Sequence, residues 1–271
     1  MAGISNSVVI VNFNSRVALL ALLKSLALHE ATSTEVIVVD SASTDGSVEA
    51  AREACPQAKV MRLETNRGFY AAVNKGIDRA EGDVAIVCHA DVIADIHTLA
   101  ELGDQARETE GRKVAAVVPR LVGVDGAEQP FVATLPKLAT GVAGALNPVA
   151  AWQSRVPFLD HLAENEWARF ACVALSQNYL ATTGAFDPRF FLYYGDADQC
   201  SRIHAKHLRV LISKTVKVTH AGASLAKDFP PHLLRILRKD QEQYAQKHFP
   251  SWQQGVVRAA GTVGRWFANS D

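Results

Sequence analysis

The sequence predicts an α/β fold in which a mostly parallel central sheet carries helices on both faces. Over the first 121 residues, short apolar runs rich in Val, Ile and Ala alternate with longer segments of helical periodicity. Apolar, β-branched runs of this kind are typical of strands buried on both faces of a parallel sheet. The length of 271 residues lies within the range of a single α/β domain.

The expected elements alternate along this first part of the chain. Apolar runs predict strands at residues 7–13, 34–40, 59–64, 83–89 and 113–121. Helical patterns predict helices between them, at residues 16–29, 43–55, 68–80 and 96–108. Such alternation builds βαβ units, which set their strands in parallel and place their helices over both faces of the sheet.

The rhythm changes after Leu121. Residues 122–161 are rich in Gly, Pro and Ala and have weak periodicity, so we expect an irregular or partly helical excursion of the kind that covers a site. Order returns at residues 169–176 and leads on to a strand-like segment at 214–222. Residues 232–249 predict a terminal helix.

Composition argues against several classes of protein. Lys and Arg number 28, as do Asp and Glu, so the formal net charge is zero and nothing favours nucleic-acid binding. The four cysteines form no CxxC pair, which favours free thiols in a reducing cytosol over a zinc ribbon or a disulfide framework. The N-terminal residues show no secretory signal, and no run approaches the roughly 18 apolar residues of a membrane span. We therefore expect a soluble, cytoplasmic protein.

Polar residues at the strand ends are the candidates for ligand binding, because ligands of such sheets bind beyond the carboxyl ends of the strands. They are Asn12, Asn14, Asp40 to Asp45, Asn66, Arg67, His89 and Asp91. Ser43 to Asp45 can cap the next helix, which leaves Asp40 to accept hydrogen bonds from a base or ribose. No GxGxxG follows the first strand and no GxxxxGK[ST] occurs, which argues against a dinucleotide-dependent dehydrogenase and a P-loop NTPase.

His89 and Asp91 stand two residues apart at the end of a buried strand. Residues at this spacing on an extended chain point to the same side. Two such side chains suit a divalent cation bound to a diphosphate, which needs only one or two protein ligands. An imidazole is a tolerable ligand for Mn²⁺ and a poorer one for Mg²⁺. The alternative is that Asp91 caps a helix and His89 is incidental.

Asp196 and Asp198 follow the aromatic stretch 190–194. A carboxylate beside aromatic walls is partly desolvated, so its pKa rises and it becomes a better general base. The alternative is a helix start, where either aspartate would interact favourably with the helix dipole. His220 ends a late strand and becomes a candidate ligand only if that strand end lies near His89.

Taken together, these motifs resemble the family 2 glycosyltransferases, which are inverting enzymes of the GT-A fold, and most closely their rhamnosyltransferase-like bacterial branch. The resemblance rests on the order and spacing of the segments VVIVNFNSRVALLALLKSL, EVIVVDSASTDGSVEAA, NRGFYAAVNKGI, GDVAIVCHADV, GAFDPRFFLYYGDADQCSRI and VTHAGAS. It implies a single GT-A domain over residues 1–271. Residues 1–121 would form the nucleotide-sugar-binding half, and residues 122–271 the acceptor-binding and catalytic half with the C-terminal helix.

The resemblance also implies roles for individual residues. Asp91 would bind the Mg²⁺ or Mn²⁺ ion that holds the nucleotide diphosphate. His89 stands where the family usually has Asn or Asp, so it could ligate the metal, contact the sugar or ribose, or weaken the metal dependence. A late histidine joins the metal in some relatives, which nominates His220. The first aspartate of the later motif is the usual base, so Asp196 inherits that role, with Gly195 where the family often has Glu.

Further residues are expected to hold the substrates. The expected donor-binding residues are Asn12, Asn14, Asp40, Ser41, Asn66, Arg67, Gly68, Asn74, His89 and Ala90. The expected acceptor-binding residues are Tyr194 and Asp198. The implied donor is a dTDP- or UDP-linked sugar, such as dTDP-rhamnose or a UDP-hexose, and the implied acceptor is a cell-surface glycan or lipid-linked saccharide. The chain could also form a homodimer.

The implied reaction is a single in-line displacement. Asp196 takes the proton from an acceptor hydroxyl, the oxygen attacks the anomeric carbon, and the nucleoside diphosphate leaves from the opposite face with inversion. Asp91 and the metal neutralise the leaving charge. The alternative function is a catalytically silent nucleotide-sugar-binding or scaffold domain, which the unusual His89 and Gly195 motivate. A nucleotidyltransferase is disfavoured because no Gly-, Arg- and Lys-rich triphosphate loop occurs near the N-terminus.

The terminal helix mixes apolar and basic residues. Residues 233–239, LLRILRK, set four aliphatic side chains among two arginines and a lysine. Such a helix could rest on an anionic membrane, which would place the protein peripherally at the inner face. The alternative is a helix that packs on the core with a solvated charged face.

Overall fold

The computed structural model describes residues 4–26, 33–108, 113–146, 154–157, 159–222 and 230–268. Within these ranges the centre is an eight-stranded sheet of order β3-β2-β1-β4-β9-β6-β10-β5. Its strands are β1 (Asn6–Asn12), β2 (Thr34–Asp40), β3 (Lys59–Arg62), β4 (Val84–His89), β5 (Val92–Ile93), β6 (Val114–Val122), β9 (Cys172–Ser176) and β10 (Arg209–His220). A separate two-stranded sheet pairs β7 (Val132–Thr134) with β8 (Glu166–Ala168).

The predicted, mostly parallel sheet is confirmed. β1 pairs in parallel with β2 and β4, β2 with β3, and β6 with β10. β9 lies antiparallel between β4 and β6, and β5 lies antiparallel to β10. Because β9 reverses direction between two strands, β1 to β4, β6 and β10 all point the same way. Their carboxyl ends therefore meet at one edge of the sheet.

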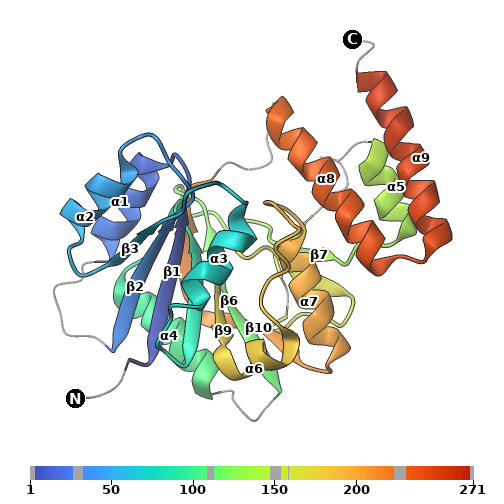
Figure 1. The fold of residues 1–271 in the computed structure, drawn as a ribbon. Coiled ribbons are helices and arrows are strands. Elements are labelled where there is room, and N and C mark those ends of the chain that lie inside the picture. Colours follow the sequence, from blue (N-terminus) through green and yellow to red (C-terminus); the bar gives the residue numbers. More distant parts are fainter. Residues whose placement is uncertain are drawn as a thin grey trace.

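Helices cover the sheet as the α/β pattern predicts (Figure 1). They are α1 (Arg16–Ser25), α2 (Ser47–Ala54), α3 (Phe69–Ile77), α4 (Ile96–Glu108), α5 (Leu138–Leu146), α6 (Gln177–Thr183), α7 (Gly195–Ala205), α8 (Pro231–His248) and α9 (Ser251–Ala268). α3 packs on β1 and β2, and α4 packs on β4, β6, β9 and β10. Every residue of β1 and β2 is buried, so these strands form the centre of the core.

The C-terminal part of the chain differs from the expected single helix. The expected helix forms as α8, but a second helix, α9, follows it. Phe249 is extended, as a residue before proline prefers, and Pro250 separates the two helices. α5, α8 and α9 share a small core of Ala145, Ala245 and Val257 and lie to one side of the sheet (Figure 1). In the described ranges, no helix combines the length and apolar character needed to cross a membrane.

Candidate active site

The ends of β4 and β10 bring His89, Asp91 and His220 together. After Asp91 the chain turns into β5, which pairs antiparallel with β10 so that Val92 lies opposite His220. The Ala221 N–H donates to the Asp91 carbonyl at 2.9 Å. His220 Nε2 lies 3.5 Å from Asp91 Oδ2, and His89 Nδ1 lies 3.9 Å from Asp91 Oδ1. One ligand atom from each side chain lies within 4.8 Å of the other two, so a single cation could contact all three.

Two further observations fit a cation at this cluster. Asp91 Oδ1 is buried without a hydrogen-bond partner among the described residues, which is costly unless another group satisfies the oxygen. Gly222 faces the cluster, because an added Cβ there would collide with Asp91 Oδ2 and lie 2.7 Å from His220 Nε2. The space beside Gly222 is therefore within reach of both ligand atoms, as the short metal–oxygen distances of roughly 2.0–2.6 Å require.

Gln129 holds the His220 ring. Its side-chain N–H donates to the His220 carbonyl at 3.0 Å, so its Oε1 is the atom that pairs with His220 Nδ1 at 3.0 Å. Nδ1 therefore carries the ring proton, and Nε2, which faces Asp91, keeps the lone pair that a metal ligand needs. Burial lowers the pKa of His220 despite the nearby Asp91 carboxylate, which favours the neutral ring.

His89 lies between the cluster and Phe69. Its ring meets the Phe69 ring edge to face, with centroids 4.5 Å apart, and lies 6.2 Å from the His220 ring. Burial, opposed by Asp91 and aided by His220, lowers the pKa of His89. The ring is therefore neutral near pH 7, the form in which imidazole binds metal.

Asp196 combines the two alternatives that its sequence context left open. It stands in the first turn of α7, and it is also desolvated, at 7% exposure. Burial raises the pKa of its carboxyl to about 7, although backbone N–H groups of Ala197 and Phe170 and the charge of Arg169 oppose the rise. A carboxyl group that titrates near neutrality is suited to take a proton from a hydroxyl.

Residues 169–171 link Asp196 to the metal-ligand cluster. The Phe170 backbone binds the Asp196 carboxyl, and the Ala171 carbonyl accepts the His89 N–H at 2.9 Å. Arg169 lies close enough to both parts to act on each. Its charge limits the rise in the pKa of Asp196 and helps to lower the pKa of His220. The candidate base and the candidate metal ligands thus belong to one site.

Tyr70 explains why Gly195 replaces the glutamate that the resemblance leads one to expect. An added Cβ at Gly195 would collide with the Tyr70 ring, so a larger side chain has no room there. The Asp196 N–H donates to the Tyr70 hydroxyl at 3.2 Å. The Tyr70 ring also stacks on Phe186, with centroids 5.3 Å apart. Tyr70 of α3 and Phe186, which follows α6, therefore form an aromatic wall beside Asp196.

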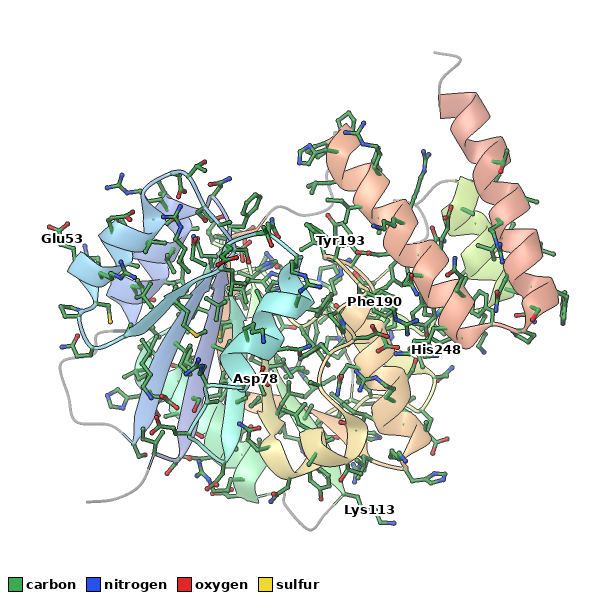
Figure 2. The ribbon with its side chains drawn as sticks, viewed as in Figure 1. Glu53, Asp78, Lys113, Phe190, Tyr193 and His248 are labelled. Atoms are coloured by element: carbon green, nitrogen blue, oxygen red, sulfur yellow. The ribbon has the colours of Figure 1, made fainter. Side chains whose placement is uncertain are left out.

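A carboxylate from α8 fastens the loop that leads into α7. Asp240 is fully buried and accepts the backbone N–H groups of residues 191–193 at 2.8–2.9 Å. Tyr194 then takes a φ of 63°, a left-handed conformation that is rare in a bulky residue, and α7 begins at Gly195. The labelled Tyr193 lies in this loop, on the side of the molecule that faces α8 (Figure 2).

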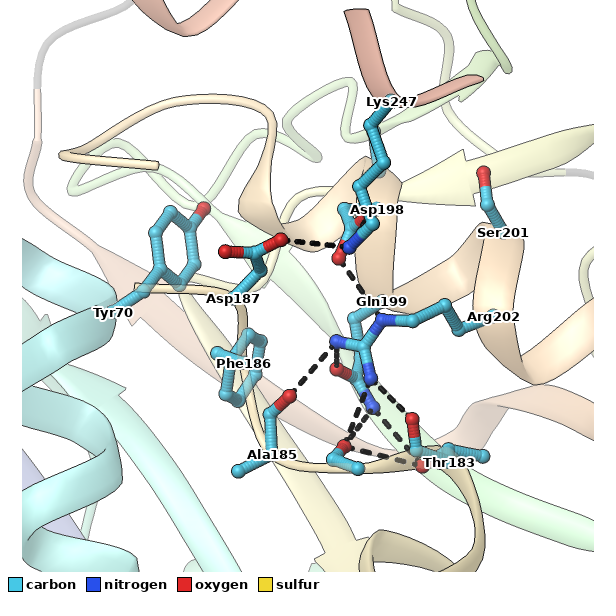
Figure 3. A network of polar contacts seen from close by, with 12 residues as sticks. Tyr70, Thr183, Ala185, Phe186, Asp187, Asp198, Gln199, Ser201, Arg202 and Lys247 are labelled. Atoms are coloured by element: carbon cyan, nitrogen blue, oxygen red, sulfur yellow. Dashed lines mark hydrogen bonds and ion pairs between the residues drawn. The ribbon is translucent and has the colours of Figure 1, made fainter. Parts of the chain in front are cut away.

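Asp198 lies at the centre of an ion network (Figure 3). The side chain is 0% exposed, with Arg202 Nε at 3.0 Å, Lys247 Nζ at 2.7 Å and His248 Nε2 at 2.8 Å from its oxygens. Burial alone would raise the pKa of Asp198, but His248, Lys247 and Arg202 together hold it below its usual value. The network joins α7 to the end of α8. Contact of Asp198 and the buried Tyr194 with an acceptor stays a prediction.

Several expected donor-binding residues build the loop after β2. Asn12 is fully buried, and the two N–H groups of its amide are shared among three acceptors, Asp40 Oδ1 at 2.7 Å, Ser43 Oγ at 3.1 Å and Ser47 Oγ at 2.9 Å. The exposed Asn14 accepts the Thr44 N–H at 2.8 Å. Asp40 and Ser41 are both 1% exposed. An open pocket of about 420 Å³ adjoins this loop, with Ala42, Arg62, Leu63 and Glu64 in its lining.

Other expected donor-binding residues join the two halves of the chain. Gly68 has a φ of 97°, and an added Cβ would lie 2.5 Å from the Phe191 carbonyl oxygen. Asn66 Oδ1 accepts the Gly68 N–H at 2.9 Å, and the Asn74 amide bonds twice to the Phe186 backbone, at 2.7 and 3.0 Å.

Two expected donor-binding residues remain. Arg67 is exposed, whereas Ala90 is buried beside His89. Contact of any of the expected residues with a nucleotide sugar stays a prediction.

Sequence reasoning missed Gln129, Arg169, Tyr70 and Asp240 as members of the site. Gln129, Arg169 and Asp240 reach it from elements remote in sequence and no local motif marks them, whereas Tyr70 stands inside the segment NRGFYAAVNKGI. Gly222 lies inside the segment VTHAGAS, next but one to the candidate ligand His220. A glycine so close to His220 is a signal in the sequence that a side chain would obstruct that position.

Known proteins resemble both the sequence and the fold of this chain. Residues 7–136 match the family model described as Glycosyl transferase family 2. N-acetylglucosaminyl-diphospho-decaprenol L-rhamnosyltransferase of Mycobacterium tuberculosis is 26% identical over 251 residues, which cover 85% of this chain and 81% of that protein. O-antigen biosynthesis protein RfbC of Myxococcus xanthus is 29% identical over 236 residues, 82% of this chain and 18% of that protein.

Solved structures agree on the fold. The mannosyltransferase PcManGT from Pyrobaculum calidifontis, in complex with GDP-Man and Mn²⁺, superposes with a TM-score of 0.56 at 16% identity, covering 96% of this chain and 74% of that one. Residues 1–349 of S. aureus TarS superpose with a TM-score of 0.56 at 17% identity, covering 94% of this chain and 78% of that one. The chain thus has the GT-A fold of glycosyltransferases, and its residues 7–136 are similar in sequence to glycosyl transferase family 2.

Proposed function

We propose that this chain is a metal-dependent, inverting glycosyltransferase that moves a sugar from a nucleotide-diphosphate donor to a hydroxyl of a glycan or lipid-linked saccharide. The observation that carries the proposal is the single site in which residues 169–171 join His89, Asp91 and His220 to Asp196. A cluster of candidate cation ligands, joined to a carboxyl group that titrates near neutrality, suits displacement of a diphosphate by a hydroxyl.

The metal would be held by Asp91 with His220 and His89. The buried, unsatisfied Asp91 Oδ1 and the space beside Gly222 fit a small cation. Two imidazoles and one carboxylate favour Mn²⁺ over Mg²⁺, which prefers oxygen ligands. A divalent cation at this place supplies Lewis-acid neutralisation of charge on the diphosphate.

The chain's own groups would do the rest. Asp196, in its ionised form, takes the proton of the acceptor hydroxyl while the hydroxyl oxygen forms a bond to the anomeric carbon. The bond from that carbon to the phosphate oxygen breaks, and its electron pair leaves with the nucleoside diphosphate. Attack and departure on opposite faces invert the anomeric configuration. The aromatic wall of Tyr70 and Phe186 limits water beside Asp196.

The donor we propose is dTDP-rhamnose or a UDP-hexose. The named activity of the Mycobacterium relative, an L-rhamnosyltransferase acting on N-acetylglucosaminyl-diphospho-decaprenol, supports rhamnose as the first sugar to test and a lipid-linked acceptor. The pocket beside Ser41 and Ala42 lies beyond the ends of β2 and β3, where the base and ribose would lie. In this arrangement residues 1–121 hold the donor, and residues 122–271 supply Asp196 and the acceptor side.

The proposal is tested by the Asp196→Asn variant. With dTDP-rhamnose, UDP-hexoses and a GlcNAc-diphospho-lipid, we expect the variant to keep nucleotide affinity and to lose transfer by about 10²-fold or more, because amides do not accept the proton. Asp78→Asn, which changes an exposed aspartate at the end of α3, is the matched control. Equal turnover by Asp196→Asn and wild type would remove Asp196 as the base. Donor binding by the wild type without any turnover would favour the silent binding domain.

A further inference from the structure

Asp240 is a buried carboxylate that the proposed chemistry does not use. It lies on α8, is 0% exposed, and accepts three consecutive backbone N–H groups, from Phe191 to its Oδ1 and from Leu192 and Tyr193 to its Oδ2. Burial raises its pKa, against the effect of the three bonds. Burying a carboxyl group is costly, so its place between a helix and a loop calls for a reason beyond packing.

The three bonded amides lie directly ahead of the candidate base. Tyr194 follows them in the left-handed conformation, at a φ of 63°, and Asp196 comes two residues later in the first turn of α7. A bulky residue stays in this conformation only when its surroundings impose it. The direction in which the chain enters α7 is therefore fixed on its N-terminal side by Asp240.

A second set of contacts holds the same helix further along. Lys247 and His248, at the end of α8, bind Asp198. The Asp198 network holds side chains of α7, whereas Asp240 holds main-chain groups of the loop before it. α8 therefore binds both the first turn of α7 and the loop that precedes it, and Asp240 is the residue that binds the loop.

We propose that Asp240 is a positioning residue for Asp196, because its carboxylate fixes residues 191–193 so that α7 begins with Asp196 buried beside Phe170 and Tyr70. The inference rests on the proposed function for the role of Asp196 as the base. It gives α8 a part in the chemistry that does not require α8 to contact the substrates.

The Asp240→Asn variant tests this role. An asparagine has one acceptor oxygen, and its NH₂ group would face backbone N–H donors, so it cannot make the three bonds. We expect the amides of residues 191–193 to exchange with solvent about tenfold faster or more. Asp196 then gains access to water, so its pKa should fall from about 7 toward its ordinary value, as followed by ¹³C NMR with Asp196→Asn to assign the signal.

Glu35→Gln provides the matched control. Glu35 is also a buried carboxylate and accepts from Ser7 Oγ and the Glu81 N–H, but it lies at the opposite end of β2 from Asp40. The Glu35→Gln substitution should lower the free energy of unfolding without moving the pKa of Asp196. In Asp240→Asn, UDP affinity with Mn²⁺ should stay within about twofold, while the kcat for donor turnover falls about tenfold at an unchanged KM for the donor.

The outcomes separate this inference from the proposed function. An unchanged Asp196 titration and unchanged exchange in Asp240→Asn would overturn the positioning role. If that variant does not fold, amide exchange in the wild-type protein tests the positioning role. Rapid exchange of the 191–193 amides in the intact chain would contradict the hydrogen bonds from these amides to Asp240. A wild-type protein that binds no UDP would defeat the proposed function, but the titration and exchange experiments would still decide the role of Asp240.

Discussion

At the scale of single residues, the burial that raises the pKa of the Asp196 carboxyl group also lowers the stability of the fold. An aspartate in an unfolded chain titrates near 3.9, whereas burial raises the pKa of Asp196 to about 7. Between these values the folded state holds the proton and the unfolded state does not. The unfolding free energy therefore falls as the pH rises from about 4 to about 7, and the stabilising proton is lost above that range.

Asp196→Asn should consequently stabilise the protein while it abolishes transfer. We expect a gain of about 1–4 kcal/mol in the unfolding free energy at pH 8, and little gain at pH 4, because only the ionised carboxylate is penalised. Urea unfolding of both proteins across this pH range measures it. A gain that does not depend on pH would show that the burial of Asp196 is not what matters.

Gly222 gives a second prediction at this scale. Its φ is not in the left-handed region, so Gly222→Ala should fold, but the new Cβ would collide with Asp91 Oδ2 and crowd His220 Nε2. We expect Mn²⁺ affinity to fall about tenfold or more, measured by calorimetry on the protein without substrates. Gly255→Ala, where an added Cβ meets nothing within 4 Å, should bind Mn²⁺ like the wild type. Wild-type affinity in Gly222→Ala would argue against a metal beside Gly222.

The sequence could predict some of these residues and not others. His89 and Asp91 were visible because two polar side chains interrupt a buried apolar run, although the chain turns at residues 90–91 and does not stay extended as expected. Gln129 and Asp240 were not visible, because their partners lie far away in sequence. Gln129 contacts His220, 91 residues later, and Asp240 contacts Leu192, 48 residues earlier. Such contacts exist only once β6 lies beside β10 and α8 beside the loop before α7.

At the scale of elements, the turn after β6 completes the metal-ligand cluster. Val122 bridges Glu128 in this turn, and the Gln129 N–H donates to the Leu121 carbonyl at 2.8 Å. Because β6 pairs with β10, with Val122 opposite Thr219, the turn delivers the Gln129 amide to the His220 ring. The first residues of the expected excursion therefore support the site directly.

Gln129→Leu tests the contribution of this turn. Without the amide the His220 ring loses its fixed tautomer and orientation, so Mn²⁺ affinity should fall about 10–100-fold. The control is Gln105→Leu on α4, which removes hydrogen bonds to Glu101 and Thr215. If Gln129→Leu bound Mn²⁺ as tightly as Gln105→Leu, His220 would not need Gln129 to act as a ligand.

The elements that the sequence predicted were those with strong local patterns. The strands of the first half and the helix at 96–108 occur where the apolar runs and the helical period indicate them. The antiparallel direction of β9 is not encoded in its own residues, because a buried strand reads the same either way. α9 was missed because glycines at 255, 261 and 264 weaken its helical pattern, and its packing on α5 and α8 overrides that weakness.

At the scale of the whole molecule, the site lies where the two halves of the chain meet. The end of β4 supplies His89 and Asp91, β10 supplies His220, and α7 supplies Asp196. The packing of Gly68 on Phe191 joins the same two halves. Membrane contact through α8 and formation of a homodimer stay predictions. Asp240 and Lys247 show that part of α8 faces inward, toward α7 and the loop that precedes it.

Nucleotide binding with and without metal decides whether Asp91 holds a cation that binds the donor diphosphate. Calorimetry would titrate UDP and dTDP into the wild-type chain and the Asp91→Ala variant, each with and without Mn²⁺. We expect Mn²⁺ to raise the affinity of the wild type for at least one of the two nucleotides about tenfold or more, and Asp91→Ala to lose this gain. Equal affinity with and without Mn²⁺, or no binding of either nucleotide, would contradict it.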